Sequence, residues 1–425
     1  MHVPKVVLAG LVLLGAALAG PAPLLAPAAA SPIVQTSVVS ARPASSPPRI
    51  TTGTAAYKLL QAGPTMYVGG DFTGITNAAR TQTFARHNLF SFEASTGAVT
   101  RLSATFDGPV WALAHHGDSL YVGGTFRTVN GSSRRALVKV DAATGAVDRA
   151  FDARLLTGSV TEAQVVRGRL VVGGTFGKRL AALDLTTGAD TGYLDLGITG
   201  TVATNAGPTG VYRFAVDRDS TRLVAIGNMT HVAGRERSRA FMVDLGTSAG
   251  TLASWYYPPL KRACAASKLQ DYLRDVDFSP DGRWFVMVST GYVPLPGDLG
   301  LTVCDATARF ETGIVNPTRP TWINYTGGDT LHSVVATNAA VYVQGHQRWL
   351  DNAAGRDSCA PGCAARPGIG AISPSTGRAL SWNPTKSRGV GGKDLLLTPQ
   401  GLWVASDTTQ LAGQLHERLG LFPLP

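Results

Sequence analysis

Charged side chains are scarce in this chain, at 16% of its 425 residues. Acidic residues are the scarcer kind, with 28 Asp plus Glu against 38 Lys plus Arg, and only five of them are Glu. This composition is atypical of a helical bundle or a disordered polymer, whereas 49 Gly and 25 Pro are typical of a turn-rich all-β protein. The net charge of +10 is compatible with an anionic partner, but a solvated basic surface explains it equally well, and we expect no nucleic-acid partner.

The sequence also lacks the local motifs of common enzyme classes. It has no HExxH, no GxSxG, no phosphate-binding glycine loop and no EF-hand spacing. Residues 279–284 superficially resemble a sialidase Asp-box, but the Gly directly follows Asp281, so a β-turn is the better interpretation. An acid/base pair for glycoside cleavage would need Asp residues that folding brings together. We therefore expect a binding protein rather than an enzyme, with no metal or cofactor, and we predict no catalytic residue.

The longest apolar run lies at the N-terminus, where residues 6–19 follow Lys5 and a Pro/Ala segment ends in three alanines at 28–30. This pattern is typical of a secretory signal with an A-x-A cleavage site, so we expect residues 1–30 to be a signal peptide and 31–425 the mature domain. A membrane anchor is the alternative, but Gly and Pro interrupt the run before the roughly 20 residues that a spanning helix needs. We expect a secreted or cell-surface protein without a membrane span.

Cysteine is rare as well, with four residues in all. In a secreted chain these predict two disulfides, for which three pairings are formally open. Sequence proximity and the repeat described next favour Cys264 with Cys304 and Cys359 with Cys363. A zinc site is the alternative, but no His lies at ligand spacing from these cysteines.

What the sequence does contain is a repeat. Residues 120–126 read LYVGGTF, with near copies at 66–72 and 170–176, a looser copy at 223–229, and weaker echoes at 285–290, 341–346 and 402–407. The first small or equivalent residues of the copies are Gly69, Gly123, Gly173, Gly227, Ser289, Gln344 and Ala405, which lie 50 to 62 positions apart. Seven units of this length favour a β-propeller over a solenoid, whose repeats are usually shorter.

The second unit shows the expected strands most clearly. Apolar segments at 110–114, 120–126, 136–140 and 146–151 alternate with turn residues. We therefore predict an all-β, seven-bladed β-propeller of four-stranded antiparallel blades. The last unit stops after its third strand, so we expect the mature N-terminus to supply the missing strand at 34–39, close the ring and leave a monomer without an exposed edge.

The YVGGxF repeats, together with 274–282 (RDVDFSPDG), Cys304-Asp305, 320–329 (PTWINYTGGD) and 345–350 (GHQRWL), resemble secreted actinobacterial β-propeller proteins of the delta-60-repeat type. The resemblance extends over the whole mature chain and implies a seven-bladed propeller exported from the cell. The family is largely uncharacterised, so the resemblance implies no catalytic residues. The chain departs from the pattern where Ser289 and Gln344 replace the glycine, and in the loop between Cys359 and Cys363.

Candidate binding residues come from loops that a propeller gathers on one face, where sites draw on several blades. The sixth unit has a long insertion in which Trp beside polar groups suits sugar stacking, and Asp407 ends the equivalent strand of the seventh unit. The candidates there are His346, Gln347, Arg348, Trp349, Asp351, Asp357 and Asp407. The alternative is a structural plug whose polar groups are satisfied by backbone.

Basic residues recur just before the third strand of several units and form what we call the basic arc. It comprises Arg80, Arg134, Arg135, Lys178, Arg179, Arg235, Arg237 and Arg239. Such an arc could bind carboxylates or phosphates of a polymer, with Arg134 and Arg135 as the test residues. The alternative is that each residue only keeps a strand entry soluble.

The sequence therefore predicts an exported module that binds a ligand or partner at the cell surface or outside the cell. The expected partner is an anionic or carbohydrate cell-wall polymer or another extracellular protein. Two other functions stay open: a polysaccharide hydrolase or lyase with its site in the central funnel, and a structural element of an envelope assembly.

Overall fold

The computed structural model describes residues 1–2, 35–202, 206–265 and 271–425. The predicted signal peptide, residues 1–30, lies outside the described residues apart from its first two. The chain divides into Met1–Pro32 and Ile33–Pro425, and the strands of the described residues belong to the second unit. In the described part of the chain, no helix has the length and apolar character needed to cross a membrane.

The predicted all-β class is confirmed, with one 3-10 helix at Pro258–Lys261 as the exception among the described residues. The larger sheets are antiparallel and follow one another along the chain. The first contains β1 (Arg49–Ala62), β2 (Thr65–Thr76), β3 (Thr83–Ala85) and β4 (Leu89–Glu93), the second β5 (Val110–His116), β6 (Ser119–Gly124) and β9 (Leu137–Asp141), and the third β10 (Val160–Val166), β11 (Arg169–Gly174) and β12 (Leu180–Leu183). The fourth contains β13 (Gly210–Val216), β14 (Arg222–Asn228), β17 (Ala240–Leu245) and β18 (Gly250–Leu252), and the fifth β19 (Leu273–Phe278), β20 (Trp284–Ser289), β21 (Ala306–Glu311) and β22 (Trp322–Tyr325).

The sixth sheet contains β23 (Leu331–Ala336), β24 (Val341–Gly345) and β27 (Ile369–Ile372), and the seventh β28 (Gly392–Thr398), β29 (Gly401–Ser406) and β32 (Leu419–Pro423). Short hairpins fill four of the loops between second and third strands: β7 (Thr128–Val129) with β8 (Ser132–Ser133), β15 (His231–Val232) with β16 (Arg235–Glu236), β25 (Trp349–Leu350) with β26 (Ala364–Ala365), and β30 (Gln410–Leu411) with β31 (Gln414–Leu415). Four strands are predicted in every unit, but among the described residues the second, third, sixth and seventh sheets have three each. In the second, third and sixth, single bridges stand in place of the fourth strand: Val140 with Val147, Leu183 with Asp190, and Ile372 with Ala379.

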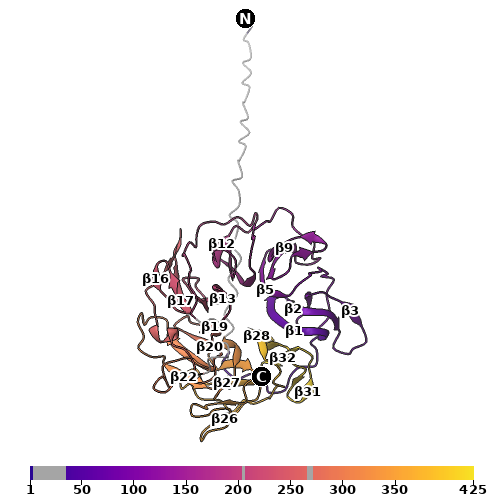
Figure 1. Cartoon of the computed structure of the whole chain (residues 1–425). Helices are drawn as coiled ribbons and strands as arrows, with labels where there is room; N and C mark the ends of the chain where they lie inside the picture. Colours follow the sequence, from indigo (N-terminus) through magenta and orange to yellow (C-terminus); the bar gives the residue numbers. More distant parts are fainter. Residues whose placement is uncertain (3–34, 203–205, 266–270) are drawn as a thin grey trace. The chain divides into compact units, whose positions relative to one another are not determined.

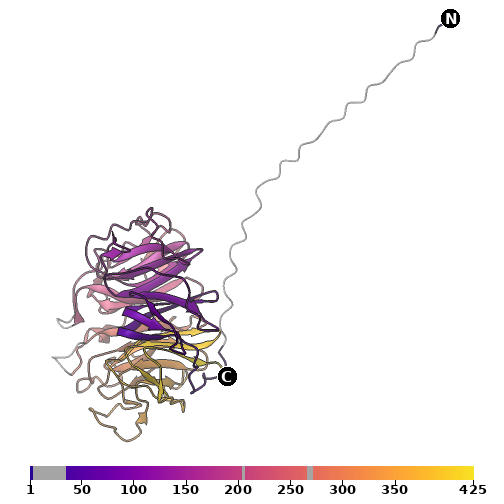
Figure 2. The ribbon, with the colours of Figure 1, turned by 90° about the vertical axis from the view of Figure 1, so that its right-hand side faces the viewer.

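The first strands of successive sheets contact one another, β1 with β5, β5 with β10, and so on, and β28 in turn contacts β1. Figure 1 shows β5, β13, β19 and β28 toward the middle of this unit, with β3, β16, β22 and β26 toward its periphery. Figure 2, turned by 90°, agrees with Figure 1 in placing the yellow C-terminal strands beside the indigo β1.

The hydrophobic core consists of separate clusters, each lying between two successive sheets. One joins Tyr67 and Leu89 of the first sheet to Leu113 and Val122 of the second. The corresponding cluster at the other end of the chain packs Trp403 of the seventh sheet against the first, with the rings of Trp403 and Phe92 5.4 Å apart. The second strands are buried on both faces because each faces two such clusters.

The repeated glycine is required by the close approach of neighbouring sheets. A Cβ added to Gly123 would lie 2.6 Å from Val160 Cγ1 of the next sheet, and one added to Gly69 would lie 2.5 Å from Val110 Cγ1. Where Gln344 replaces the glycine, the facing residue of the next sheet is itself Gly392, whose added Cβ would lie 2.0 Å from Gln344 Cδ. Here the large residue lies on the second strand and the glycine on the first strand of the next sheet, the reverse of the arrangement at Gly123 and Val160.

The N-terminal segment lies against the last strand. The amides of Ser40 and Ala44 donate to the carbonyls of Pro423 and Leu421, at 2.9 and 2.8 Å. Pairing is predicted for 34–39, but residue 34 lies outside the described part, and the observed hydrogen bonds to β32 come a few residues later. Val39, 2% exposed, fills the cluster between the sixth and seventh sheets instead.

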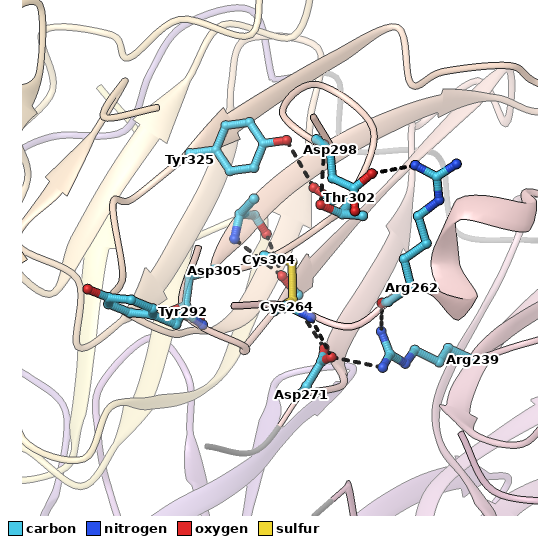
Figure 3. Close-up of a disulfide and its surroundings, with 12 residues drawn as sticks. Arg239, Arg262, Cys264, Asp271, Tyr292, Asp298, Thr302, Cys304, Asp305 and Tyr325 are labelled. Carbon is cyan, nitrogen blue, oxygen red and sulfur yellow. Dashed lines mark hydrogen bonds and ion pairs between the residues drawn. A yellow bond between two sulfur atoms is a disulfide. The ribbon is translucent and has the colours of Figure 1, made fainter. Parts of the chain in front are cut away.

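Both predicted disulfides are confirmed, Cys264 with Cys304 and Cys359 with Cys363. Figure 3 shows the first of them beside Asp271, which accepts hydrogen bonds from the Cys264 amide at 3.0 Å and from Arg239 at 2.9 Å. No cysteine is left free. This cysteine usage fits an oxidising, extracellular environment.

Candidate functional site

Each innermost strand carries a β-bulge, and the seven bulges occupy equivalent positions. In β5, Val110 pairs with Gly124 and Ala112 with Gly123, which leaves Trp111 as the extra residue. A bulge re-aims a side chain and is common beside functional sites. The extra residues, which we call the bulge ring, are Tyr57, Trp111, Thr161, Tyr212, Arg274, His332 and Lys393.

All seven side chains of the bulge ring line one cavity of about 470 Å³. Each of these residues is half-buried, so its side chain is held by the fold and still reaches the cavity. Thr175, which follows β11, Gly207 and Pro208, which precede β13, and Arg213 of β13 also line it. The cavity thus lies at the end of the sheets where the second strands finish and the connections between sheets begin. The sequence places its candidate loops at this end.

One side of the cavity carries the cations Arg274 and Lys393 with His332 between them, and these three residues come from three successive sheets. Burial and the nearby cations, Arg274 and Lys393 first among them, hold the pKa of His332 well below 6.5, so its imidazole is neutral at neutral pH. Burial also lowers the pKa of Lys393, an effect that nearby Asp407 opposes. Among the described residues, no Asp or Glu lines this cavity.

The remaining wall is largely aromatic, with Tyr57, Trp111, Tyr212 and Tyr272. The Arg274 guanidinium lies 4.1 Å from the centre of the Tyr272 ring, and the rings of Tyr212 and Tyr272 meet edge to face at 5.8 Å. The Tyr212 hydroxyl is within 2.7 Å of the Ala206 carbonyl, which fixes the ring in place. Rigid aromatic faces beside cations suit a ligand that has both a flat apolar face and an acidic group.

The residues that follow the bulge ring along each strand form a second layer, which we call the charge belt. Its charged members are Lys58, Glu162, Arg213, Asp275 and Asp394. Glu162 accepts hydrogen bonds from Lys58 Nζ at 3.0 Å and from Arg213 Nη1 at 2.9 Å. These three side chains come from the first, third and fourth sheets, and the intervening second sheet has only the small Ala112 at this position.

A second cavity, of about 360 Å³, adjoins the charge belt and also reaches Asp277. The carboxylates here accept hydrogen bonds from backbone amides of the next first strand: Asp394 from Leu59 at 2.8 Å, Asp275 from Val334 at 2.9 Å, and Asp277 from Ala336 at 2.8 Å. These amides lie on inner edge strands and have no ladder partner on that side, so the carboxylates satisfy them. Burial raises the pKa of both Asp275 and Asp277 to about 7.

The structure brings Arg348, Trp349 and Asp357 together, as the sequence suggests, but their contacts are mostly with one another. The Arg348 guanidinium lies 4.3 Å from the Trp349 ring centre, donates to Asp357 at 2.9 Å, and donates to Asp329 at 2.8 Å. Asp351 lies apart and accepts a hydrogen bond from Asn324 Nδ2 at 2.6 Å. None of these side chains lines either cavity.

Two other candidates lie beside the bulge ring. Asp407 Oδ2 is 3.8 Å from Lys393 Nζ, and the rings of His346 and His332 are 6.2 Å apart. His346 Nε2 accepts the Thr330 amide at 3.3 Å, while Gln347 is fully buried and its side-chain amide has no hydrogen-bond partner in the described part of the chain.

Several residues of the basic arc form hydrogen bonds or ion pairs with other residues of this chain. Arg134 donates to the Ser133 carbonyl at 2.9 Å, and Arg135 is exposed. Lys178 pairs with Asp190 at 2.7 Å, and Arg239 with the buried Asp271. Ligand binding by Arg134 and Arg135 stays a prediction.

Sequence reasoning missed the bulge ring because it followed the second strands. A signal was present: in several first strands, two adjacent aromatic or charged residues interrupt an apolar segment, as in Tyr57-Lys58, Tyr212-Arg213 and Lys393-Asp394. In a regular strand, adjacent residues face opposite sides, so such a pair on a buried strand predicts a bulge with both side chains on one side.

Comparison with known proteins adds little. No protein-family model matches the chain, and no curated protein does. Among solved structures, the chain is similar to the computationally designed Ika8 protein, with a TM-score of 0.46, 10% identity, and 88% of this chain and 98% of that chain covered. Similarity this low supports no argument about function, which has to come from the cavity.

Proposed function

We propose that residues 31–425 form an exported seven-bladed β-propeller that binds an acidic carbohydrate in the cavity of the bulge ring. The propeller is supported by three features: the succession of antiparallel sheets, the core clusters between neighbours, and the contact of β28 with β1. The hydrogen bonds between the N-terminal segment and β32 support closure by the mature N-terminus. Membership in the delta-60-repeat group is part of the same proposal.

The observation that carries the function is the chemistry of the seven bulge residues. Bulges disrupt the backbone ladder locally, and they are over-represented next to active sites, where they re-aim side chains. Here they place aromatic rings on one side of a cavity and Arg274, His332 and Lys393 on the other. A sugar ring can stack on the aromatic side while its carboxylate pairs with the cations.

The distribution of charge separates this ligand class from others. The cations are gathered inside a cavity rather than along an exposed stripe, which disfavours nucleic acid as the partner. Hydrolysis by two carboxylates is also disfavoured, because Asp275, Asp277 and Asp394 lie in the second cavity and already accept backbone amides. Location outside the cell is supported by the two disulfides.

The first prediction concerns binding by Lys393. The mature protein is titrated calorimetrically with uronate-containing and neutral oligosaccharides that it retains on a glycan array. Lys393→Gln should weaken binding of acidic ligands roughly 10-fold, because a charge-assisted contact is lost. Lys139→Gln, which removes an ion-paired lysine outside both the cavity and the basic arc, serves as the matched control and should bind like wild type.

The double variant Arg134→Ser and Arg135→Ser tests the basic arc in the same titration and by retention on anionic cell-wall material at low salt. If this double variant binds more weakly while Lys393→Gln binds like wild type, the ligand binds at the basic arc and not in the cavity of the bulge ring. Absence of any acidic glycan ligand would contradict the proposed function.

A further inference from the structure

His332 is the one member of the bulge ring whose side chain is an imidazole, a group that can accept a proton near neutral pH. Its imidazole lines the cavity, and no hydrogen bond to it is present within the described residues. Its neighbours in the ring are Arg274 of β19 and Lys393 of β28, the strands that contact β23 on its two sides. A neutral imidazole between two cations can accept a proton beside an acidic group bound by those cations.

The imidazole is positioned by backbone. Gly391 has a φ of +141°, and a Cβ there would lie 2.5 Å from His332 Cδ2 and 2.9 Å from its Nε2. The glycine therefore lets the chain pack flat against the ring. The His346 ring centre lies 6.2 Å from that of His332, and His346 Nδ1 lies 3.2 Å from the carbonyl of Val390, the residue before Gly391. Gly391 and His346 are positioning residues for the imidazole.

We propose that the bulge ring cleaves uronate-containing polysaccharides by β-elimination, with His332 as the base and with Arg274 and Lys393 bound to the uronate carboxylate. This inference rests on the proposed function, since the substrate is a ligand of the same cavity. It adds the chemical step and narrows the ligand to a polymer of uronic acid linked through O4.

The reaction balances without a cofactor or an oxidant. The carboxylate makes the neighbouring C5–H acidic once its charge is compensated by the two cations. His332 takes the C5 proton, and the C5–H electron pair becomes the C4=C5 double bond. The C4–O4 bond breaks with its electrons on oxygen, and the leaving oxygen takes a proton from water. The imidazolium then returns its proton to solvent.

The composition of the cavity favours elimination over hydrolysis. Glycoside hydrolysis requires a carboxylic acid and a carboxylate on either side of the bond, and the described lining of this cavity contains neither. Elimination requires a base and charge compensation, and both are present. The aromatic side, with Tyr57 and Trp111, would hold the sugar units adjacent to the cleaved bond.

The test uses the purified mature chain with polygalacturonate, alginate and a glucuronate-containing glycosaminoglycan, and with dextran as the neutral control. Ultraviolet absorbance reports the conjugated C4=C5 double bond, a reducing-end assay reports total cleavage, and calorimetry reports binding. We expect absorbance to rise with at least one uronate polymer in proportion to reducing ends. His332→Gln should lower that rate by roughly 100-fold or more while its affinity for the polymer changes little.

His116→Gln is the matched control, because His116 is exposed at the far end of β5 from the bulge. His332→Asn provides a second variant if His332→Gln unfolds early in a thermal melt. Binding without any rise in absorbance would overturn elimination and leave the proposed function standing. New reducing ends without absorbance would mean hydrolysis and also overturn it. If no uronate polymer binds at all, both proposals fail.

Discussion

At the scale of single residues, Asp277, beside the charge belt, shows how an inward-facing carboxylate can satisfy a backbone amide. Asp277 of β19 accepts the Ala336 amide of β23 at 2.8 Å, so it connects two sheets whose inner strands do not pair. Burial, together with the nearby Asp275, raises its pKa to about 7. The hydrogen bond to Ala336 stabilises the fold, whereas the negative charge of the Asp277 carboxylate destabilises it because the group is taken out of water.

This unfavourable charge gives a pH-dependent prediction. The folded pKa of about 7 exceeds the unfolded value of about 3.9, so between these values the folded state holds a proton that the unfolded state has released. The contribution of Asp277 to the free energy of unfolding therefore falls as pH rises from about 4 to 7 and is flat above. Asp277→Asn keeps an acceptor for the Ala336 amide without the charge, so it should stabilise the protein at pH 8 by about 1–2 kcal/mol, with a smaller gain at pH 5.

Urea unfolding of wild type and Asp277→Asn at both pH values measures this difference, since the other titrating groups of the second cavity are common to both proteins: Lys58, Glu162, Asp275 and Asp394. A variant that is equally destabilised at pH 5 and pH 8 would show that the carboxylate geometry matters and its charge does not.

At the scale of the strand, a bulge separates two roles that lie next to each other in the sequence. Val110 is fully buried in the cluster between the first and second sheets, and its Cγ1 faces Gly69. Trp111, one position later, is half-buried and belongs to none of the core clusters. Of these two adjacent residues of β5, Val110 therefore stabilises the core and Trp111 lines the cavity.

Two single substitutions test this division. Val110→Ala should lower the free energy of unfolding by about 2 kcal/mol, because it leaves a space against Gly69 and removes buried apolar surface. Trp111→Ala should change it by less than about 0.5 kcal/mol but weaken binding of the acidic glycan, because a stacking face is lost. Chemical denaturation and calorimetric titration of both variants give the comparison, and a large stability loss in Trp111→Ala would place that side chain in the core after all.

The difference between residues that pack in the core and residues that line the cavity explains what the sequence could and could not predict. The second strands were predictable because their glycine and apolar residues are repeated in each unit and are fixed by local packing, as at Gly123. The disulfides were predictable from proximity and the repeat. The bulge ring was not, because its residues differ from unit to unit and share only a place in the cavity. Tyr57 and Lys393 come together only when the chain returns to its beginning.

At the scale of the whole described unit, stability depends on how the two ends of the chain meet. β28 contacts β1, and the cluster around Trp403 and Phe92 joins the seventh sheet to the first. The segment that precedes β1 continues past this junction to the outer edge of β32. It thereby covers a strand edge that would otherwise be open to pairing with another chain.

Deleting residues 31–45 should therefore lower the melting temperature by roughly 10 °C or more and promote association through the uncovered edge of β32. The deletion removes the Ser40 and Ala44 hydrogen bonds to that strand and the buried Val39. Tyr342→Phe is a milder companion, because the Tyr342 hydroxyl accepts both the Val39 amide at 2.9 Å and Gln35 Nε2 at 2.8 Å, and its loss should cost about 1–2 kcal/mol. Differential scanning calorimetry with light scattering measures both effects. An unchanged melting temperature in the deletion variant would contradict closure by the N-terminal segment. If only Tyr342→Phe lowered the melting temperature, the Tyr342 hydroxyl would stabilise the sixth sheet and not the contact with the N-terminal segment.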